Sequence, residues 1–446
     1  MPGTASASAG ARYKFPLGIF GDRRYHPRTV GLELKGRRGP LLVLIALGVA
    51  IVATIVGIVL LTTGGGGTAS ASSKLDTSFR APTGYDSLDG VYNKESFSCG
   101  STDSQCVRDY LVKVTDDYGP SASLGIMGRL QQEGKVDRSV NDHDMAHSVG
   151  RETAKDYGSN FKAFDLCPVT FNYGCSHGFF EYVLARTDTP KQAATTICES
   201  RSSKDTFLIA GFTCYHGVGH GIMMAEAYNV QNSLKACNTL DTHEAKDGCW
   251  QGVFMENVNA GMSGRALPGV FKRSDPLAPC DKVGDQYKHE CYINHAGWLM
   301  TVAKYDLRKG SRYCLKVKGR YESSCFQSIG LMVTNPTWQA GLGPELVKAR
   351  EPEAVIAAKL CGRFPAAGQK DCVTAGVDNL ANFDRLQTKR SRDFCNSVPA
   401  SVKESCLRQV GVNLKNRTSD PQVIRQSCSG LGAEARACLA GAGVSS

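Results

Sequence analysis

The chain lacks the sequence patterns of several common metalloproteins. No His-Glu-x-x-His motif occurs, which excludes the usual zinc-protease arrangement of ligands. No Cys-x-x-Cys-His motif occurs, so covalent attachment of a c-type haem is excluded as well. No stretch of alternating apolar and polar residues is long enough to indicate a β domain. We therefore expect an all-α fold.

The chain also lacks an extended basic surface, although its net charge is +10. Residues 1–40 contain eight Lys or Arg residues and only two acidic residues, so most of the excess lies at one end. The remaining positive charge is spread over about four hundred residues, which is too dilute for nucleic-acid binding. We expect no nucleic-acid partner, and we expect residues 1–40 to form a disordered basic tail.

Residues 41–61 form a run of 21 positions without a charged side chain. A helix of about 20 apolar residues spans the hydrocarbon core of a bilayer, so this segment predicts a transmembrane helix. The basic tail before it places the N-terminus in the cytoplasm and the rest of the chain outside. The alternative is a cleaved signal peptide, because Ala69-Ser70-Ala71 resembles a cleavage site, but the apolar run is longer than such peptides usually have.

All eighteen cysteines follow this segment, where an oxidising compartment favours disulfides. Their spacing predicts pairs of sequence neighbours, most of them 10 to 12 residues apart, and the second cysteines recur mostly every 32 to 42 residues. Such a period indicates a helical repeat, or solenoid. The predicted pairs are 99/106, 167/175, 198/214, 237/249, 280/291, 314/325, 361/372, 395/406 and 428/438.

The sequence of each repeat predicts a hairpin of two helices joined by a disulfide near the turn. The first helix often opens with proline, as at Pro190, Pro276, Pro352 and Pro421, and proline fits the first helical position. The second helix carries the second cysteine in its opening turns. A glycine recurs shortly after this cysteine, for example Gly252, which predicts close approach of neighbouring helices.

This layout is similar to the disulfide-bridged, cysteine-rich branch of the Sel1-type helical repeats. The likeness covers the period and the arrangement of the elements. The paired cysteines are farther apart here, and the Sel1 and TPR consensus residues are absent.

Histidines distinguish the first repeats from the later ones, because the last 151 residues contain none. Two and six residues after Cys214 lie His216 and His220, and the same offsets from Cys175 give His177 and Glu181. Taking Asn141 as the equivalent of the missing cysteine in the preceding unit gives a further pair. The six candidate ligands are thus His143, His147, His177, Glu181, His216 and His220.

Residues four apart share one face of a helix, so each pair presents two side chains together. Neighbouring helices pack about 8–10 Å apart, which lets equivalent side chains converge. Imidazole nitrogens with a carboxylate favour a divalent metal, zinc first, with iron or copper as alternatives. If the site is catalytic, Glu181 or Glu256 is expected to handle protons for metal-activated water or metal-centred oxidation. Two neighbouring ions are compatible with this set.

Two other functions compete with a metal site. The histidines could be hydrogen-bonded core residues copied by duplication, in a non-enzymatic scaffold that binds a protein or cell-wall ligand. A non-covalent haem would need an apolar slot, which Phe179, Phe180, Met223 and Met224 could line. Against the first alternative, later repeats keep the cysteines without the histidines, so the repeat fold does not require them.

The sequence therefore predicts a single-pass cell-membrane protein with an extracytoplasmic helical repeat domain and an unidentified small-molecule or cell-surface ligand. The expected segments are the tail at 1–40, the membrane helix at 41–61, a flexible linker at 62–97, and the repeat domain at 98–446, with histidine-bearing repeats at about 135–260 and histidine-free repeats at about 300–446.

Overall fold

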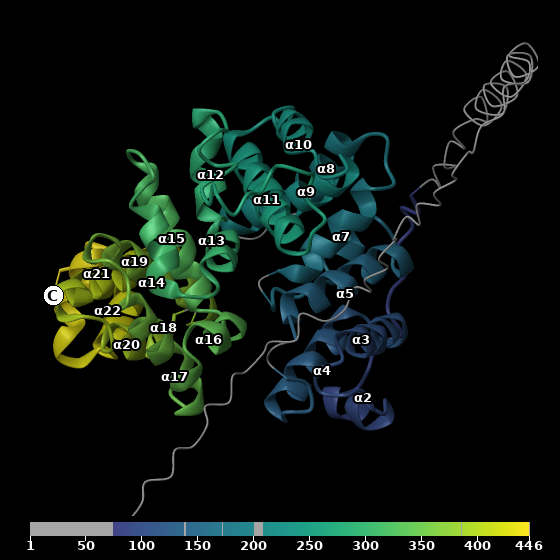
Figure 1. The fold of residues 1–446 in the computed structure, drawn as a ribbon. Coiled ribbons are helices and arrows are strands. Elements are labelled where there is room, and N and C mark those ends of the chain that lie inside the picture. The colour runs from purple at the N-terminus through teal and green to yellow at the C-terminus, as the bar shows by residue number, and fades with distance from the viewer. Residues whose placement is uncertain (1–74, 138–139, 172, 200–207, 385, 446) are drawn as a thin grey trace, which may run out of the picture. The chain divides into compact units, whose positions relative to one another are not determined.

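The computed structural model describes residues 75–445, apart from 138–139, 172, 200–207 and 385. These residues form 22 α-helices and two short 3-10 helices, and they contain no β-strand (Figure 1). The all-α expectation is therefore confirmed for this part of the chain. The tail and the membrane segment predicted at 1–61 lie outside the described residues. Among the helices of the described residues, none is long and apolar enough to cross a bilayer.

The helices fall into two sets that alternate along much of the chain. Those carrying the second cysteine of a pair are α3 (Ser104–Tyr118), α7 (Gly174–Leu184), α9 (Leu208–Ala225), α11 (His243–Met262), α12 (Lys288–Ile293), α15 (Tyr321–Val333), α19 (Ala366–Asp384), α21 (Ala400–Arg417) and α23 (Ala435–Ala442). Those preceding them are α6 (Phe161–Phe164), α8 (Pro190–Glu199), α10 (Val230–Cys237), α14 (Leu307–Cys314), α18 (Glu353–Cys361), α20 (Lys389–Cys395) and α22 (Pro421–Ser429). The others are α2 (Leu88–Lys94), α4 (Pro120–Gln132), α5 (Asp142–Asp156), α13 (Ala296–Ala303), α16 (Pro336–Leu342) and α17 (Pro344–Lys348), with 3-10 helices at Asp285–Tyr287 and Gly432–Glu434.

All nine disulfides predicted from the spacing are present, and each joins cysteines 7 to 16 residues apart in the chain. Six of them connect the two helices of a hairpin, from α8–α9 to α22–α23. In the chain-entropy model, closing a loop of this size stabilises the folded state by roughly 3 kcal/mol. So many disulfides indicate an oxidising, extracytoplasmic compartment.

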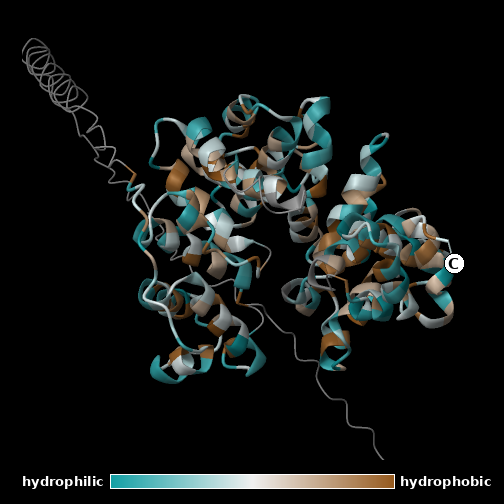
Figure 2. Cartoon of the chain, turned by 180° about the vertical axis from the view of Figure 1, so that it is seen from behind, coloured by the Kyte–Doolittle hydropathy of each residue, from teal (hydrophilic) through white to brown (hydrophobic). Residues whose placement is uncertain are grey.

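The second helices form the spine of the repeat domain. Helix α5 packs on α7, α7 on α9, and α9 on α11, and the same succession continues from α15 through α19 and α21 to α23. One buried apolar cluster runs through these contacts from Val91 to Ala442. The hydropathy colours of Figure 2 accordingly show apolar residues along the whole series of helices rather than in one segment.

Local sequence explains where several of these helices begin. Asn229 and Thr242 cap α10 and α11 through side chains that accept hydrogen bonds from backbone amides. Asp420 caps α22 in the same way, and Pro421 occupies its first turn, as the sequence predicted. Pro190 also opens its helix, whereas Pro352 lies one position earlier than expected, at the N-cap of α18.

Two sequence expectations are wrong. Residues 62–74 of the flexible linker predicted for 62–97 lie outside the described residues, and its described part contains α2, whose residue Val91 is 3 % exposed and belongs to the core. Ser87 caps this helix, and Leu88 packs against the Cβ position of Gly125. Pro276 opens no helix: the residues around it form turns, because Pro279 lacks the amide hydrogen that a continuing helix would need.

Candidate metal centre

Three consecutive spine helices carry the candidate ligands. Helix α5 supplies His143 and His147, α7 supplies His177, and α9 supplies His216 and His220. These three helices and α11 make the most extensive helix–helix contacts of the described chain. The site therefore lies among extensively packed helices, and their glycines allow this packing.

Glycines let the helix backbones touch at the histidine positions. A Cβ on Gly178 of α7 would lie 1.8 Å from the backbone oxygen of His147 on α5, and one on Gly252 of α11 would lie 2.0 Å from that of His216 on α9. A Cβ on Gly219 of α9 would lie 2.1 Å from the backbone oxygen of Cys249 on α11, so the close approach involves glycines of both helices. Only glycine permits such approach, so the predicted close packing is confirmed at these positions.

The same contacts correct the alignment of the first histidine unit. Gly252 lies three residues after Cys249 and meets the residue two after Cys214. Gly178 likewise lies three residues after Cys175, and it contacts His147. His147 is therefore equivalent to His216, which lies two residues after its cysteine. Its cysteine equivalent is therefore Met145, one helical turn later than Asn141, which instead caps α5. The histidines equivalent in space are His147, His177 and His216.

Despite this shift, the five imidazoles form one cluster. His147, His177, His216 and His220 are all buried, and His143 is partly buried. The separations of ring centroids are 4.6 Å for His143–His147, 5.2 Å for His143–His177, 5.4 Å for His147–His220, 4.8 Å for His177–His216 and 4.6 Å for His177–His220. Side chains from three repeats thus meet at one place, as the offsets predicted.

The rings meet in two pairs through their Nε2 atoms. These atoms are 3.0 Å apart for His143 and His147, and 3.2 Å apart for His216 and His220. A proton on one nitrogen makes such a contact a hydrogen bond, whereas two unprotonated nitrogens would direct their lone pairs at each other. A metal bound at about 2.0–2.1 Å from each nitrogen also accommodates nitrogens at roughly this separation.

The Nδ1 atoms of the first histidine in each pair face neutral acceptors. His143 Nδ1 lies 2.8 Å from the backbone oxygen of Phe171, and His216 Nδ1 lies 2.8 Å from Oε1 of Gln251. The amide nitrogen of Gln251 donates to Glu290, which is consistent with its oxygen facing the ring. A carbonyl oxygen only accepts, so it fixes a proton on Nδ1 and leaves Nε2 free as a ligand.

The Nδ1 atoms of the second histidines face carboxylates. His147 Nδ1 is 2.6 Å from Oε1 of Glu181 on α7, and His220 Nδ1 is 3.2 Å from Oε2 of Glu256 on α11. Both carboxylates are 3 % exposed. A carboxylate behind an imidazole is the usual support of a metal-binding histidine, because it orients the ring and makes its free nitrogen more basic.

An arginine compensates each buried carboxylate. Arg151 of α5 donates to Oε2 of Glu181, and the guanidinium of Arg265 lies 3.5 Å from Oε1 of Glu256. Both arginine side chains reach solvent, whereas both carboxylates are enclosed. The sequence pattern predicted no role for Arg265, Gln251 or the Phe171 carbonyl. Gln251 lies two residues after Cys249, the same offset as His216 from Cys214, and this offset was the one sequence feature that could have indicated a role for it.

Burial governs the protonation of the cluster. It lowers the pKa of His143, His216 and His220 to about 3, with neighbouring imidazoles adding to the effect. Burial also lowers the pKa of His177 well below its ordinary value. For His147 the carboxylate of Glu181 outweighs burial, so its pKa is raised. Most of the rings are therefore neutral near pH 7, the form that binds metals.

The two carboxyl groups differ in their ionisation. Burial opposes the charge of Glu181, but His147 and Arg151 hold its pKa well below the ordinary range. Burial and the nearby charge of Glu181 raise the pKa of Glu256 to about 7. Glu181 is thus a fixed anion, whereas Glu256 can hold a proton near neutral pH.

His177 stands at the centre of the cluster and differs from the other four histidines. Its Nδ1 is buried and has no hydrogen-bond partner. Within the histidine cluster, three groups of side chains offer ligand atoms within 4.8 Å of one another: His143/His147/His177, His177/His216/His220 and His147/Glu181/His220. These buried clusters could hold a metal ion, and His177 is the only member common to the two all-histidine groups.

The remaining histidines of the described residues lie outside the cluster. His243 and His289 are exposed, as expected from the sequence. His295 is fully buried, and its Nε2 donates to the backbone oxygen of Pro276. Of the residues expected to line a haem slot, Phe179, Phe180 and Met223 are buried in the core. Phe180 itself packs against the Cβ position of Gly217.

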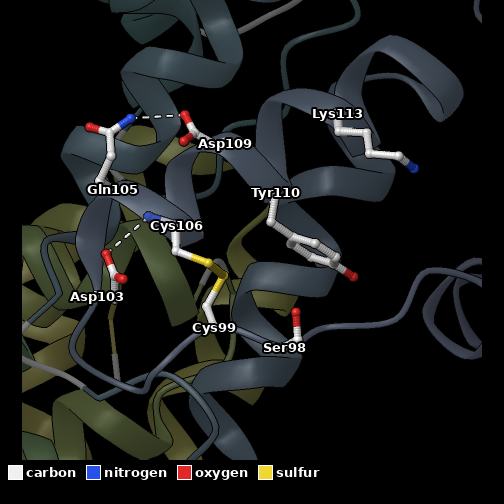
Figure 3. A pocket seen from close by; sticks show the side chains of 8 residues that line it. All are labelled: Ser98, Cys99, Asp103, Gln105, Cys106, Asp109, Tyr110 and Lys113. Atoms are coloured by element: carbon white, nitrogen blue, oxygen red, sulfur yellow. Dashed lines mark hydrogen bonds between the residues drawn. A yellow bond between two sulfur atoms is a disulfide. The ribbon is translucent and has the colours of Figure 1, made fainter.

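An open surface hollow lies beside the Cys99–Cys106 disulfide (Figure 3). Its polar groups already have partners: Gln105 donates to Asp109, and Lys113 pairs with Glu95 and Asp117. Its lining contains no histidine. This hollow therefore offers no imidazole ligand to a transition metal.

Fold and site together define a disulfide-rich helical repeat protein with a buried His/Glu cluster that could hold a metal. No protein-family model, curated protein or solved structure matches this chain.

Proposed function

We propose that this protein is an extracytoplasmic metal-binding protein whose centre is the cluster of His143, His147, His177, His216 and His220. One observation carries the proposal: two pairs of Nε2 atoms 3.0 and 3.2 Å apart are backed at every Nδ1 by a hydrogen-bond acceptor. A core histidine needs one such partner. Four rings oriented alike toward each other are the arrangement expected of ligands.

The donor set selects the metal class. Glu181 uses one oxygen for His147 and the other for Arg151, so we propose that it orients its ring rather than binding metal directly. The ligands are then imidazole nitrogens. Such a set favours zinc and copper over the harder magnesium, calcium and manganese. Zinc remains the first choice, and iron is disfavoured by the loss of the carboxylate ligand.

Catalysis by Glu181 or Glu256 and anchoring through residues 41–61 remain predictions. The buried position of both carboxylates, each hydrogen-bonded to an imidazole, supports a positioning role for them. A scaffold function in ligand binding is compatible with the repeat fold, but it gives no reason for five converging imidazoles.

Metal analysis of the full-length protein tests the proposal. After incubation with Zn²⁺ and removal of free ion, we expect stoichiometric zinc by mass spectrometry. The His216→Ala/His220→Ala variant should bind less metal than the unaltered protein, because both ligands of one pair are removed. His243→Ala is the matched control, since His243 is exposed and lies on the neighbouring helix α11.

The three proteins are compared after circular dichroism shows equal helix content. Absence of zinc, copper and iron from the unaltered protein would refute the metal proposal. Equal metal content in the double variant and the control would refute the assignment of His216 and His220.

A further inference from the structure

The cluster is built from two copies of the same set of groups. In the first set, the Phe171 carbonyl accepts from His143 and Glu181 contacts His147. Arg151 donates to Glu181. In the second set, Gln251 contacts His216 and Glu256 contacts His220. Arg265 forms an ion pair with Glu256.

Each half is thus complete in itself. It contains a pair of Nε2 atoms, a neutral acceptor behind one ring, a carboxylate behind the other, and an arginine on that carboxylate. A single ion would need only one such half. The duplicated support, built from different helices, indicates two centres of positive charge rather than one.

His177 connects the two halves. Its ring centroid lies 5.2 and 5.3 Å from those of His143 and His147, and 4.8 and 4.6 Å from those of His216 and His220. Its Nδ1 is buried and unpartnered, so no acceptor fixes its tautomer as acceptors do for the other four rings. This nitrogen therefore has no hydrogen bond to lose when it binds an ion.

We propose that the cluster is a dinuclear centre for zinc or copper in which His177 bridges the two ions. One ion is bound by His143, His147 and one nitrogen of His177, and the other by His216, His220 and the second nitrogen. Binding through both nitrogens requires loss of the ring proton of His177 to solvent, which leaves an imidazolate. This inference rests on the proposed metal-binding function.

The charges of the surroundings fit two ions. Glu181 and Glu256 place one carboxyl group behind each half, and an imidazolate at His177 adds a further negative charge between the ions. Each carboxylate lies on the far side of a ligand ring, where it offsets the charge of one ion without occupying a coordination position. A lone ion in either half would leave the opposite carboxyl group with only its histidine and arginine partners.

Stoichiometry separates one ion from two. Full-length protein is loaded with Cu²⁺, freed of excess ion and analysed by mass spectrometry, with two ions per chain expected. His143→Ala/His147→Ala and His216→Ala/His220→Ala should each retain one ion, because each removes one half. His243→Ala should retain two. Circular dichroism checks that the variants are folded.

Electron paramagnetic resonance tests the bridge in the unaltered protein and needs no variant. Two Cu²⁺ ions sharing an imidazolate couple magnetically, so the signal should fall well below that of the same copper released by acid. His177→Ala should abolish this coupling and give the spectra of separate ions or of one ion.

The outcomes separate the two proposals. One ion per chain, lost in both double variants, would overturn the dinuclear centre and leave metal binding intact. Two ions without coupling would overturn the bridging role of His177. No bound ion would refute the proposed function itself.

Discussion

The close backbone contact of Gly252 with α9 makes Gly252→Ala an informative perturbation of the site. Its Cβ would lie 2.0 Å from the His216 oxygen and 3.0 Å from the Gly219 Cα, both of them backbone atoms. Neither can rotate away, so α9 and α11 must separate by about 1 Å in a close-packed interior.

This separation has two measurable consequences. Overpacking costs about 1–3 kcal/mol, partly offset by the better helix propensity of alanine, about 1 kcal/mol. The distances from Gln251 to His216 and from Glu256 to His220, now 2.8 and 3.2 Å, would exceed the range of a hydrogen bond. Loss of such support lowers metal affinity about 10- to 100-fold.

Two other glycines serve as matched controls. Gly411→Ala creates the same clash between α21 and α23, with the Cβ 1.9 Å from the Cys438 oxygen, but far from the histidines along the chain. Gly128→Ala meets nothing closer than the Phe171 ring at 3.9 Å. Thermal unfolding and competitive Zn²⁺ titration are measured for all three variants.

We expect Gly252→Ala to lose both stability and affinity, Gly411→Ala to lose stability only, and Gly128→Ala to lose neither. Wild-type affinity in Gly252→Ala would refute the link between helix spacing and the metal site. An equal loss of affinity in Gly411→Ala would show that the effect is global.

Three further predictions concern charge, protons and disulfides. Arg151→Ala should destabilise the protein by about 1–3 kcal/mol in chemical denaturation, because it removes a partner of the buried Glu181, and Arg151→Lys should recover part of the loss; no change would contradict the pairing. The metal-free protein should lose thermal stability as the pH falls below about 6.5, because unfolded histidines take up protons that His177, His216 and His220, with their lowered pKa values, do not; His216→Gln/His220→Gln should weaken this dependence. Cys428→Ala/Cys438→Ala should cost about 2–4 kcal/mol in the last repeat and leave zinc stoichiometry unchanged, whereas loss of zinc would contradict the independence of the repeats.

Much of the fold could be predicted because its determinants are local. Each disulfide joins sequence neighbours, so spacing alone identified all nine pairs. Glycine recurrence indicated close packing because glycine within a helix has few other uses. Convergence of the histidines followed from equal offsets in repeats whose second helices stack.

The rest depends on contacts that the sequence does not display. The unit with His143 has no cysteine, and histidines four apart fit either of two registers one turn apart, so the alignment at Asn141 was displaced. The backbone acceptor at Phe171 and the reach of Arg265 depend on loops that no periodicity describes. The burial of Val91 depends on its contact with the core, which composition does not reveal.

The short sequence separation of the disulfides also bears on how the chain reaches its oxidised state. Eighteen cysteines allow tens of millions of complete pairings, the number growing steeply with each added pair. Here every correct partner is the next cysteine along the chain, at most 16 residues away. During export from the N-terminal side, each pair can close before the following cysteine emerges. Oxidation in the order of synthesis would then select the native pairing kinetically, with little need for disulfide shuffling.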